Sequence, residues 1–273
     1  MIIKGSGSYI KEKRIDKVMS QEEFCQDVCS SVYLSRVENG YYHISEKKFL
    51  ELCQKNDVCY TICSYDINEI IRNTRYSLKI SQRELSIGLC SRANLSKIEN
   101  STIIASSLLL EALLERLGYY DSESIYISSE HEVILSQYKK EVLDSFFGKK
   151  KICNVQIGFM DSYERKLYRQ LNVINSLNYS IDDIPRILKM LLLTQPTFMV
   201  SSFSSLLFNT TEIVLVIALA KIYIKEHEYR RAEIILQEIE LFFKKNTFAK
   251  EYSEVYPYFN EMYLKFLRKK EEY

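Results

Sequence analysis

The chain has 273 residues, 47% of them hydrophobic, and a formal net charge of +1. This length is enough to bury the cores of two domains, and the balanced charge excludes a protein that holds nucleic acid through its overall charge. The scarcity of glycine (7) and proline (3) leaves few turns and favours an all-α fold.

Short sequence signals argue against a membrane protein and against an enzyme. No apolar run reaches the roughly 20 residues of a membrane-spanning helix, so we expect a cytoplasmic protein. The sequence contains no phosphate-binding loop, metalloprotease helix or nucleophile elbow, and its three histidines lie far apart, at positions 43, 131 and 227. We therefore expect no catalytic residues and no cofactor.

The seven cysteines favour reduced thiols in a cytosolic chain. Their number is odd, and two pairs, Cys25/Cys29 and Cys59/Cys63, have a four-residue spacing. That spacing would place two sulfurs on one helix face, which leaves a zinc site as an alternative. Structural zinc sites usually show closer CxxC pairs, so our prediction contains no metal site.

The first 120 residues contain one sequence twice. Residues 20–39 align with residues 81–100, 61 positions later (81 minus 20), with nine identities in twenty. The same offset relates Ile10 to Ile71 and Arg14 to Arg75. We interpret this as the duplication of a whole domain, and we predict a first domain over 1–56 and a second over 57–120.

Each repeated segment is predicted to fold as two short helices around a tight turn. In the second copy Ser81 and Glu84 have the spacing of a capping box. Ser91 can cap the next helix, whose inner face carries Leu95 and Ile98. Two such helices form a helix-turn-helix, whose second helix enters the DNA major groove.

The two copies differ in charge. Residues 70–97 carry six basic side chains and one acidic side chain, whereas the equivalent residues 9–36 carry five of each. Because neutralisation of phosphates supplies most non-specific DNA affinity, we predict that the second copy is the main DNA reader and that the first is degenerate.

The run Gly88-Leu-Cys-Ser-Arg-Ala-Asn-Leu-Ser-Lys-Ile-Glu-Asn100 resembles the helix-turn-helix of XRE-type transcriptional regulators. It is similar in particular to the Gram-positive Rgg/PlcR-like group, in which this head precedes a tetratricopeptide-like body. The resemblance implies a structural salt bridge between Arg75 and Glu99. It also implies DNA contacts, with arginine suited to guanine and asparagine to adenine, from Gln82, Arg83, Ser91, Arg92, Asn94, Ser96 and Lys97.

The rest of the chain is predicted to be a linker, residues 121–129, followed by a helical tetratricopeptide-like regulatory and dimerisation domain, residues 130–273. A first helix is expected over 130–147. Further on, Ala220 and Ala232 are expected to let two antiparallel helices approach closely, with Tyr223 and Leu236 between them. An earlier, degenerate repeat over 165–196 is expected to bury Ile184 and Leu188.

In the resembled regulators the helical body dimerises and binds a short signalling peptide in quorum sensing. The resemblance therefore implies a homodimer and a signalling peptide as partners. Polar residues on otherwise apolar helices are the candidates for holding a peptide backbone: Asn172, Asn175, Asn178, Asn209 and Tyr223. The alternative for each asparagine is a buried or capping role within the fold.

The leading hypothesis is a sequence-specific, DNA-binding transcriptional regulator with tandem helix-turn-helix domains followed by an α-helical, tetratricopeptide-like solenoid. It would bind double-stranded DNA and be controlled by a peptide or protein on the helical domain. The alternative is a protein-interaction adaptor or anti-repressor that keeps the fold without specific DNA binding. The first copy, whose charges balance to zero, is what that alternative predicts for at least one domain.

Overall fold

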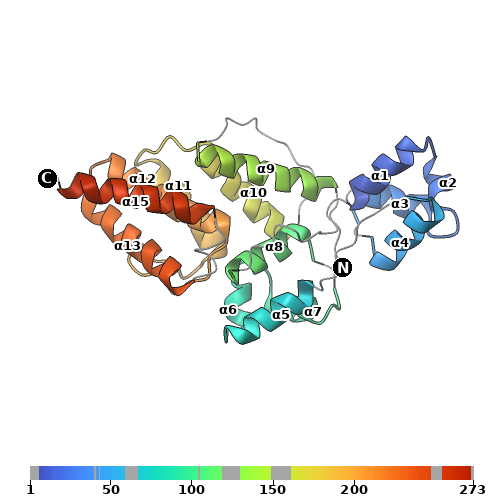
Figure 1. Cartoon of the computed structure of the whole chain (residues 1–273), viewed down its shortest axis with the longest axis horizontal. Helices are drawn as coiled ribbons and strands as arrows, with labels where there is room; N and C mark the ends of the chain where they lie inside the picture. Colours follow the sequence, from blue (N-terminus) through green and yellow to red (C-terminus); the bar gives the residue numbers. More distant parts are fainter. Residues whose placement is uncertain are drawn as a thin grey trace.

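The computed structural model describes residues 6–39, 41–42, 44–58, 67–103, 105–118, 130–148, 161–246 and 254–271. Over these residues the chain forms fourteen α-helices and no strand (Figure 1). The all-α prediction is therefore confirmed. The predicted linker, residues 121–129, lies outside the described residues.

The first eight helices form two equivalent sets of four. The first unit consists of α1 (Ser6–Asp16), α2 (Gln21–Cys25), α3 (Ser31–Glu38) and α4 (Glu46–Lys55). The second unit consists of α5 (Ile67–Ser77), α6 (Gln82–Ser86), α7 (Arg92–Glu99) and α8 (Ser107–Arg116). Each helix of the first unit starts and ends 61 residues before its counterpart, which is the offset of the sequence repeat (67 minus 6, for example).

Serine caps fix these helix starts. In the second unit the hydroxyls of Ser81, Ser91 and Ser106 accept hydrogen bonds from the backbone amides that open α6, α7 and α8. Ser20, Ser30 and Ser45 do the same for α2, α3 and α4. Because an N-cap satisfies amides that have no partner inside the helix, the repeated serines reproduce the same boundaries in both units.

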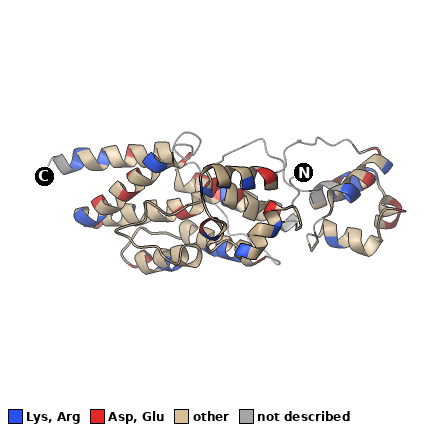
Figure 2. Ribbon diagram, turned by 90° about the horizontal axis from the view of Figure 1, so that it is seen from below, with Lys and Arg blue, Asp and Glu red and all other residues tan. Residues whose placement is uncertain are grey.

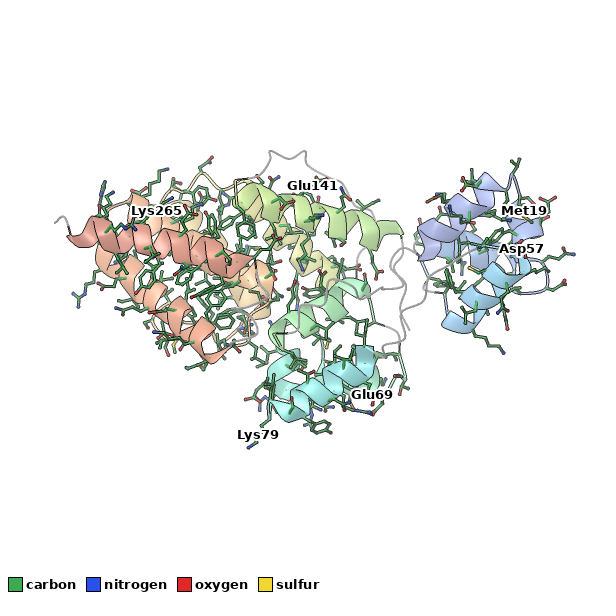
Figure 3. All side chains as sticks on the ribbon, in the orientation of Figure 1. Met19, Asp57, Glu69, Lys79, Glu141 and Lys265 are labelled. Atoms are coloured by element: carbon green, nitrogen blue, oxygen red, sulfur yellow. The ribbon has the colours of Figure 1, made fainter. Side chains whose placement is uncertain are left out.

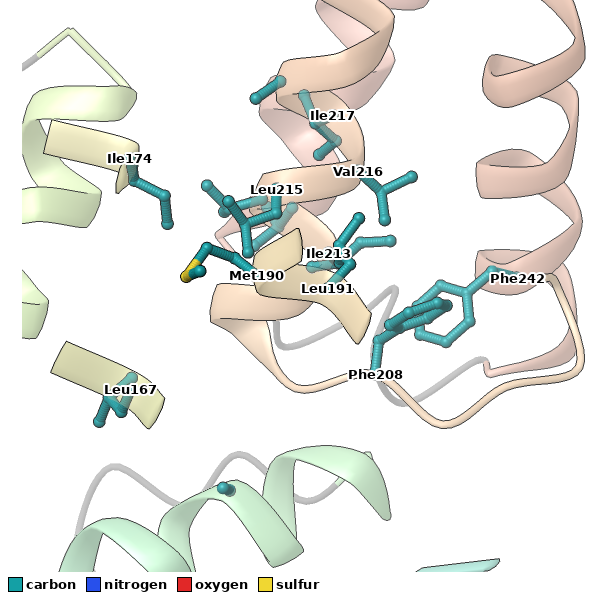
Figure 4. Packing of buried hydrophobic residues seen from close by; sticks show 14 of the residues in the cluster. Leu167, Ile174, Met190, Leu191, Phe208, Ile213, Leu215, Val216, Ile217 and Phe242 are labelled. Atoms are coloured by element: carbon teal, nitrogen blue, oxygen red, sulfur yellow. The ribbon is translucent and has the colours of Figure 1, made fainter. Parts of the chain in front are cut away.

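The remaining helices form the helical body. They are α9 (Glu130–Phe146), α10 (Ser162–Asn175), α11 (Asp183–Thr194), α12 (Thr210–Lys225), α13 (Tyr229–Lys245) and α15 (Val255–Glu271). The apolar run at 213–220 forms the centre of α12 and is completely enclosed. Helices α10, α11, α13 and α15 all pack against α12. Figure 4 shows buried residues of α10 to α13 in this core.

Small residues are buried where α12 and α13 pack together. Ala220 on α12 and Ala232 on α13 are fully buried where these two helices pack together, as is Leu236. The sequence therefore indicated this contact correctly. Tyr223 is only half-buried.

The expectation for the earlier helix pair was wrong in its register. Ile187 and Leu191 of α11 are fully buried, whereas Ile184 and Leu188 are only partly buried. The buried stripe of α11 runs through Ile187, Met190, Leu191 and Thr194, because α11 packs between α10 and α12. The repeat spacing in the sequence could not predict that α11 is packed on both sides.

The two units relate differently to the body. The buried residues of the first unit form a core of their own, whereas those of the second unit belong to the same core as α9 to α15. In Figure 1 the first unit lies at one end of the molecule, and the second unit lies against α9 and α10. None of the helices described is long and apolar enough to span a membrane.

Helices α4 and α8 explain this difference. α4 has the sequence EKKFLELCQK and leaves a charged face in solvent, whereas α8 has the sequence SLLLEALLER. Nine of the ten residues of α8 are buried, including Glu115 and Arg116. A helix that is apolar on all faces must be enclosed, so α8 requires the body and α4 does not.

Candidate nucleic-acid interface

A buried ion pair holds the second unit together. Arg75 of α5 donates from Nε to Glu99 Oε1 at 2.6 Å and from Nη2 to Oε2 at 2.8 Å, as the resemblance implied. Gln82 Nε2 donates to the same carboxylate at 2.8 Å. Burial alone would raise the pKa of Glu99, but the hydrogen bonds from Arg75 and Gln82 lower it below its usual value.

The first unit repeats this ion pair with equivalent residues. Arg14 donates to both oxygens of Glu38 at 2.7 and 2.9 Å, and Gln21 Nε2 donates to Glu38 at 2.7 Å. Gln82, predicted from the resemblance as a DNA contact, therefore also stabilises the interior of its unit. The equivalent Arg–Glu ion pairs show that both units have the same helix arrangement, although their surface residues differ.

The second unit carries exposed basic and polar side chains on α6, on α7 and in the connection between α5 and α6. Arg83, Arg92, Asn94 and Lys97 are exposed, and their side chains have no hydrogen-bond or ion-pair partner within the described parts of the chain. Ser91 is exposed but caps α7, and Ser96 is half-buried. Lys79 is exposed at the outer end of the unit, away from α9 (Figure 3). We call Lys79, Arg83, Arg92, Asn94 and Lys97 the basic face.

The first unit presents different chemistry at the same positions. Glu22 stands where the second unit has Arg83, Ser31 where it has Arg92, and Tyr33 where it has Asn94. The Tyr33 ring is covered by the Lys48 ammonium, 4.3 Å from its centroid, and also lies against Tyr42. Arg36, the counterpart of Lys97, donates to Tyr42 Oη at 2.8 Å. Figure 2 shows how acidic and basic residues are distributed along the helices.

A buried arginine fixes the second unit to the body. Arg116, at the end of α8, forms a bidentate ion pair with Glu212 of α12, with distances of 2.6 and 3.3 Å, and both side chains are completely inaccessible. Arg116 also donates to the backbone oxygens of Leu85 and Ile87 at the end of α6 and to Thr194 O at the end of α11. One side chain thus joins the helix-turn segment to two helices of the body.

A second ion pair lies beside the first. Lys139 of α9 bonds Glu115 at 2.8 Å, and the other Glu115 oxygen accepts the Thr210 amide at 2.9 Å. Burial alone would lower the pKa of Lys139, but Glu111 and Glu115 raise it above its ordinary value. The charges at this junction are compensated, as buried charges must be.

The turn between α6 and α7 contacts the body directly. Gly88 has φ +69°, and a Cβ added to it would lie 2.0 Å from Thr194 O, so no other residue fits. Lys166 of α10 donates to Gly88 O at 2.6 Å. The equivalent residue of the first unit, Asp27, has φ +62° and is exposed. The glycine therefore marks the place where the body reaches the turn.

Four buried charges of this junction, Glu115, Arg116, Lys139 and Glu212, were not identified from the sequence. A signal was present, because the charged pair Glu115-Arg116 ends a helix that offers no solvated face. A charge in such a helix needs a buried partner. Its partners come from α9 and α12, which the sequence alone does not bring near α8.

The residues expected to hold a peptide are largely engaged within the fold. Asn209 caps α12 through its side chain and is buried. Asn172 accepts a hydrogen bond from Tyr138 Oη at 2.7 Å, and the Asn175 side chain contacts the same tyrosine. Asn178 is exposed, and Tyr223 lies near Arg231, 5.8 Å from the ring centroid. Asn172, Asn175 and Asn209 thus take the bonding and capping roles that were their alternative, whereas the Asn178 side chain is exposed.

Four cysteines lie in the described residues, and all are free thiols: Cys25, Cys29, Cys53 and Cys90. Burial raises the pKa of Cys53 and Cys90 to about 11. No group of three or more His, Cys, Asp or Glu side chains in this part of the chain has the geometry to hold a metal ion. The pair Cys59/Cys63 lies outside the described residues.

Comparisons with protein-family models, with curated proteins and with solved structures found no match for this chain.

Proposed function

We propose that the chain is a sequence-specific DNA-binding regulator in which α7 of the second unit is the recognition helix of a helix-turn-helix. The observation that carries this proposal is the basic face, whose exposed cations have no partner within the described parts of the protein. Unpaired Lys and Arg side chains fit phosphates and base edges, and Arg92 and Asn94 lie in the first turn of α7. The resemblance to XRE-type regulators with a tetratricopeptide-like body supports the same function.

The first unit serves as a protein-binding module in this proposal. Glu22 in place of an arginine would repel phosphate, and Tyr33 and Arg36 are engaged in the aromatic cluster with Tyr42 and Lys48. A homodimer and a peptide or protein signal, acting through the body, complete the proposed regulator. The adaptor alternative applies to the whole chain only if the basic face does not bind DNA.

A gel shift with random-sequence duplex at low salt separates these two functions. The regulator retards the duplex, and its log affinity falls linearly with log salt concentration. Replacing Lys79 and Arg83 with alanine should reduce the slope by about 1 for each phosphate that is no longer neutralised. Arg230→Ala, at an exposed arginine on α13, is the matched control and should leave the slope unchanged. Absence of retardation at low salt would favour the adaptor.

A further inference from the structure

A lysine of the body lies inside a cage of aromatic rings. Lys221 of α12 has its ammonium 4.1 Å from the ring centroid of Tyr179, 4.7 Å from Phe146 and 5.6 Å from Tyr258. Its Nζ donates to Tyr258 Oη at 2.9 Å. The rings come from α9, from the connection between α10 and α11, and from α15, so three parts of the body converge on one cation.

This cation has no anionic partner. Within the described residues, no carboxylate forms an ion pair with Lys221. Desolvation lowers its pKa to about 8. The buried cations Arg75, Arg116 and Lys139 all have a carboxylate within 2.8 Å. Lys221 is half-buried, and charges taken out of water in proteins are normally paired. Its aromatic cage therefore lacks a negative charge.

The cage opens into a pocket of about 440 Å³ lined by Tyr179, Lys221, Ile224, Lys225 and Met262. Sites for small molecules occupy roughly 300–1,000 Å³ and combine apolar walls with few polar groups. Among the described residues that line this pocket, the charged groups are two lysines. A second pocket, of about 270 Å³, adjoins it through Ile224 and Met262. It adds Phe266 as a further apolar wall, and its one acid, Glu261, is paired with Lys265 at 2.6 Å.

We propose that this pocket binds a small amphiphilic carboxylate, with its carboxylate group on Lys221 and its apolar tail along Ile224 and Met262. The carboxylate supplies the negative charge that the cage lacks, and the tail covers the apolar walls. A neutral ligand would leave the half-buried ammonium unpaired, and a cation would add a like charge. The site is independent of whether the second unit binds DNA.

Calorimetric titration of the full chain with octanoate tests the proposal. We expect saturable binding of one octanoate per chain, with 1-octanol at least about ten-fold weaker because it lacks the charge. Lys221→Met should weaken octanoate binding by a similar factor while preserving the packing of the side chain. Lys189→Met, at an exposed lysine on α11, is the control and should bind octanoate as the wild type does.

Three results would overturn the proposal. They are the absence of saturable binding up to about 10 mM octanoate, equal affinity for octanoate and 1-octanol, and equal affinity of the wild type and a folded Lys221→Met variant. The comparison of the two ligands uses only the wild-type protein, so it remains decisive if the variant fails to fold. Circular dichroism establishes whether it has folded.

Discussion

Equivalent residues of the two units carry different chemistry on the same backbone. Val18 and Lys79 both occupy the left-handed region, with φ of +55° and +56°. The lysine belongs to the basic face, whereas the valine is 93% exposed and buries nothing. A β-branched side chain is strained in this region. The backbone of the first unit is thus strained at Val18, whereas the equivalent residue of the second unit is the exposed cation Lys79.

Val18→Asn should stabilise the first unit by about 1 kcal/mol, because asparagine tolerates the left-handed conformation. We expect amides of α1 to α4 to gain about five-fold protection in hydrogen exchange. Lys79→Asn is the matched change in the second unit and should stabilise less, since lysine is not β-branched. A loss of protection in the first unit on Val18→Asn would contradict the strain at this position.

Lys221 makes the free energy of unfolding depend on pH, and its lowered pKa determines the direction of that dependence. Its folded pKa of about 8 lies below the unfolded value of about 10.4, so between these values the unfolded chain binds more protons. Stability should then rise with pH, by up to about 1.4 kcal/mol per unit for one group. Burial raises the pKa of Tyr179 to about 12 and also raises that of Tyr258, so both stay protonated in the folded protein. Their titration in the unfolded chain is the same with and without Lys221 and cancels when the two proteins are compared.

Urea unfolding of the wild type and Lys221→Met from pH 7 to 10 measures this contribution. The variant should be at least as stable as the wild type at pH 7, and its advantage should shrink above pH 8. A constant difference across this range would show that the lysine has an ordinary pKa. Lys225 is exposed and present in both proteins, so it cancels in the comparison.

At the level of helices, α4 and α8 are equivalent, but the residues at their C-terminal ends make different contacts. In the first unit Lys55 and Asn56 satisfy the carbonyls of Gln26 and Phe24. In the second unit Arg116 alone satisfies the corresponding carbonyls of Ile87 and Leu85, and it also reaches Glu212 of α12. A local capping interaction has been extended into a contact between the second unit and the body.

Arg116→Met should therefore destabilise the chain by about 3–5 kcal/mol, because it leaves Glu212 buried without its partner. Lys55→Met at the equivalent position should cost about 1 kcal/mol or less, since the Lys55–Asp27 pair is exposed. Urea unfolding of both variants gives the two values. Adding Glu212→Gln to Arg116→Met should recover part of the loss, and equal costs for the two single variants would contradict the buried pairing.

The turns offer a second matched comparison. Gly88→Ala should cost more than about 2 kcal/mol, because the left-handed backbone and the contact with Thr194 both exclude a side chain. Asp27→Ala has a similar φ in the first unit but meets no helix of the body, so its cost should stay near 1 kcal/mol. Thermal unfolding of both variants measures this difference. Similar costs would mean that Thr194 does not restrict the turn.

The sequence repeat predicted much of the fold because its information is local. Serine caps, the Arg75–Glu99 pair and the left-handed turn residues recur at one offset, and they determine helix boundaries within each unit. Glu212, by contrast, is 96 residues from Arg116, and nothing in the spacing brings them together. The register of α11 was mispredicted for the same reason, because its neighbours α10 and α12 decide which face is buried.

For the whole molecule, the basic face and the helical body are parts of one structure. The second unit shares its core with the body. Gly88 in the turn contacts α10, Arg116 of α8 contacts α11 and α12, and Glu115 of α8 contacts α9 and the start of α12. The first unit has a separate core. In the proposed regulator, these buried contacts are the route by which a signal on the body would reach the second unit.

The proposed DNA reader is tested most directly by comparing the recognition helices of the two units. A duplex selected from random sequence is titrated with the wild type, Arg92→Ala and Asn94→Ala, and with the matched first-unit variants Ser31→Ala and Tyr33→Ala. We predict that each second-unit variant weakens specific binding by about 1–3 kcal/mol and that neither first-unit variant changes it much. Unchanged binding in Arg92→Ala and Asn94→Ala, or weaker binding confined to Ser31→Ala and Tyr33→Ala, would contradict the assignment of α7 as the reader.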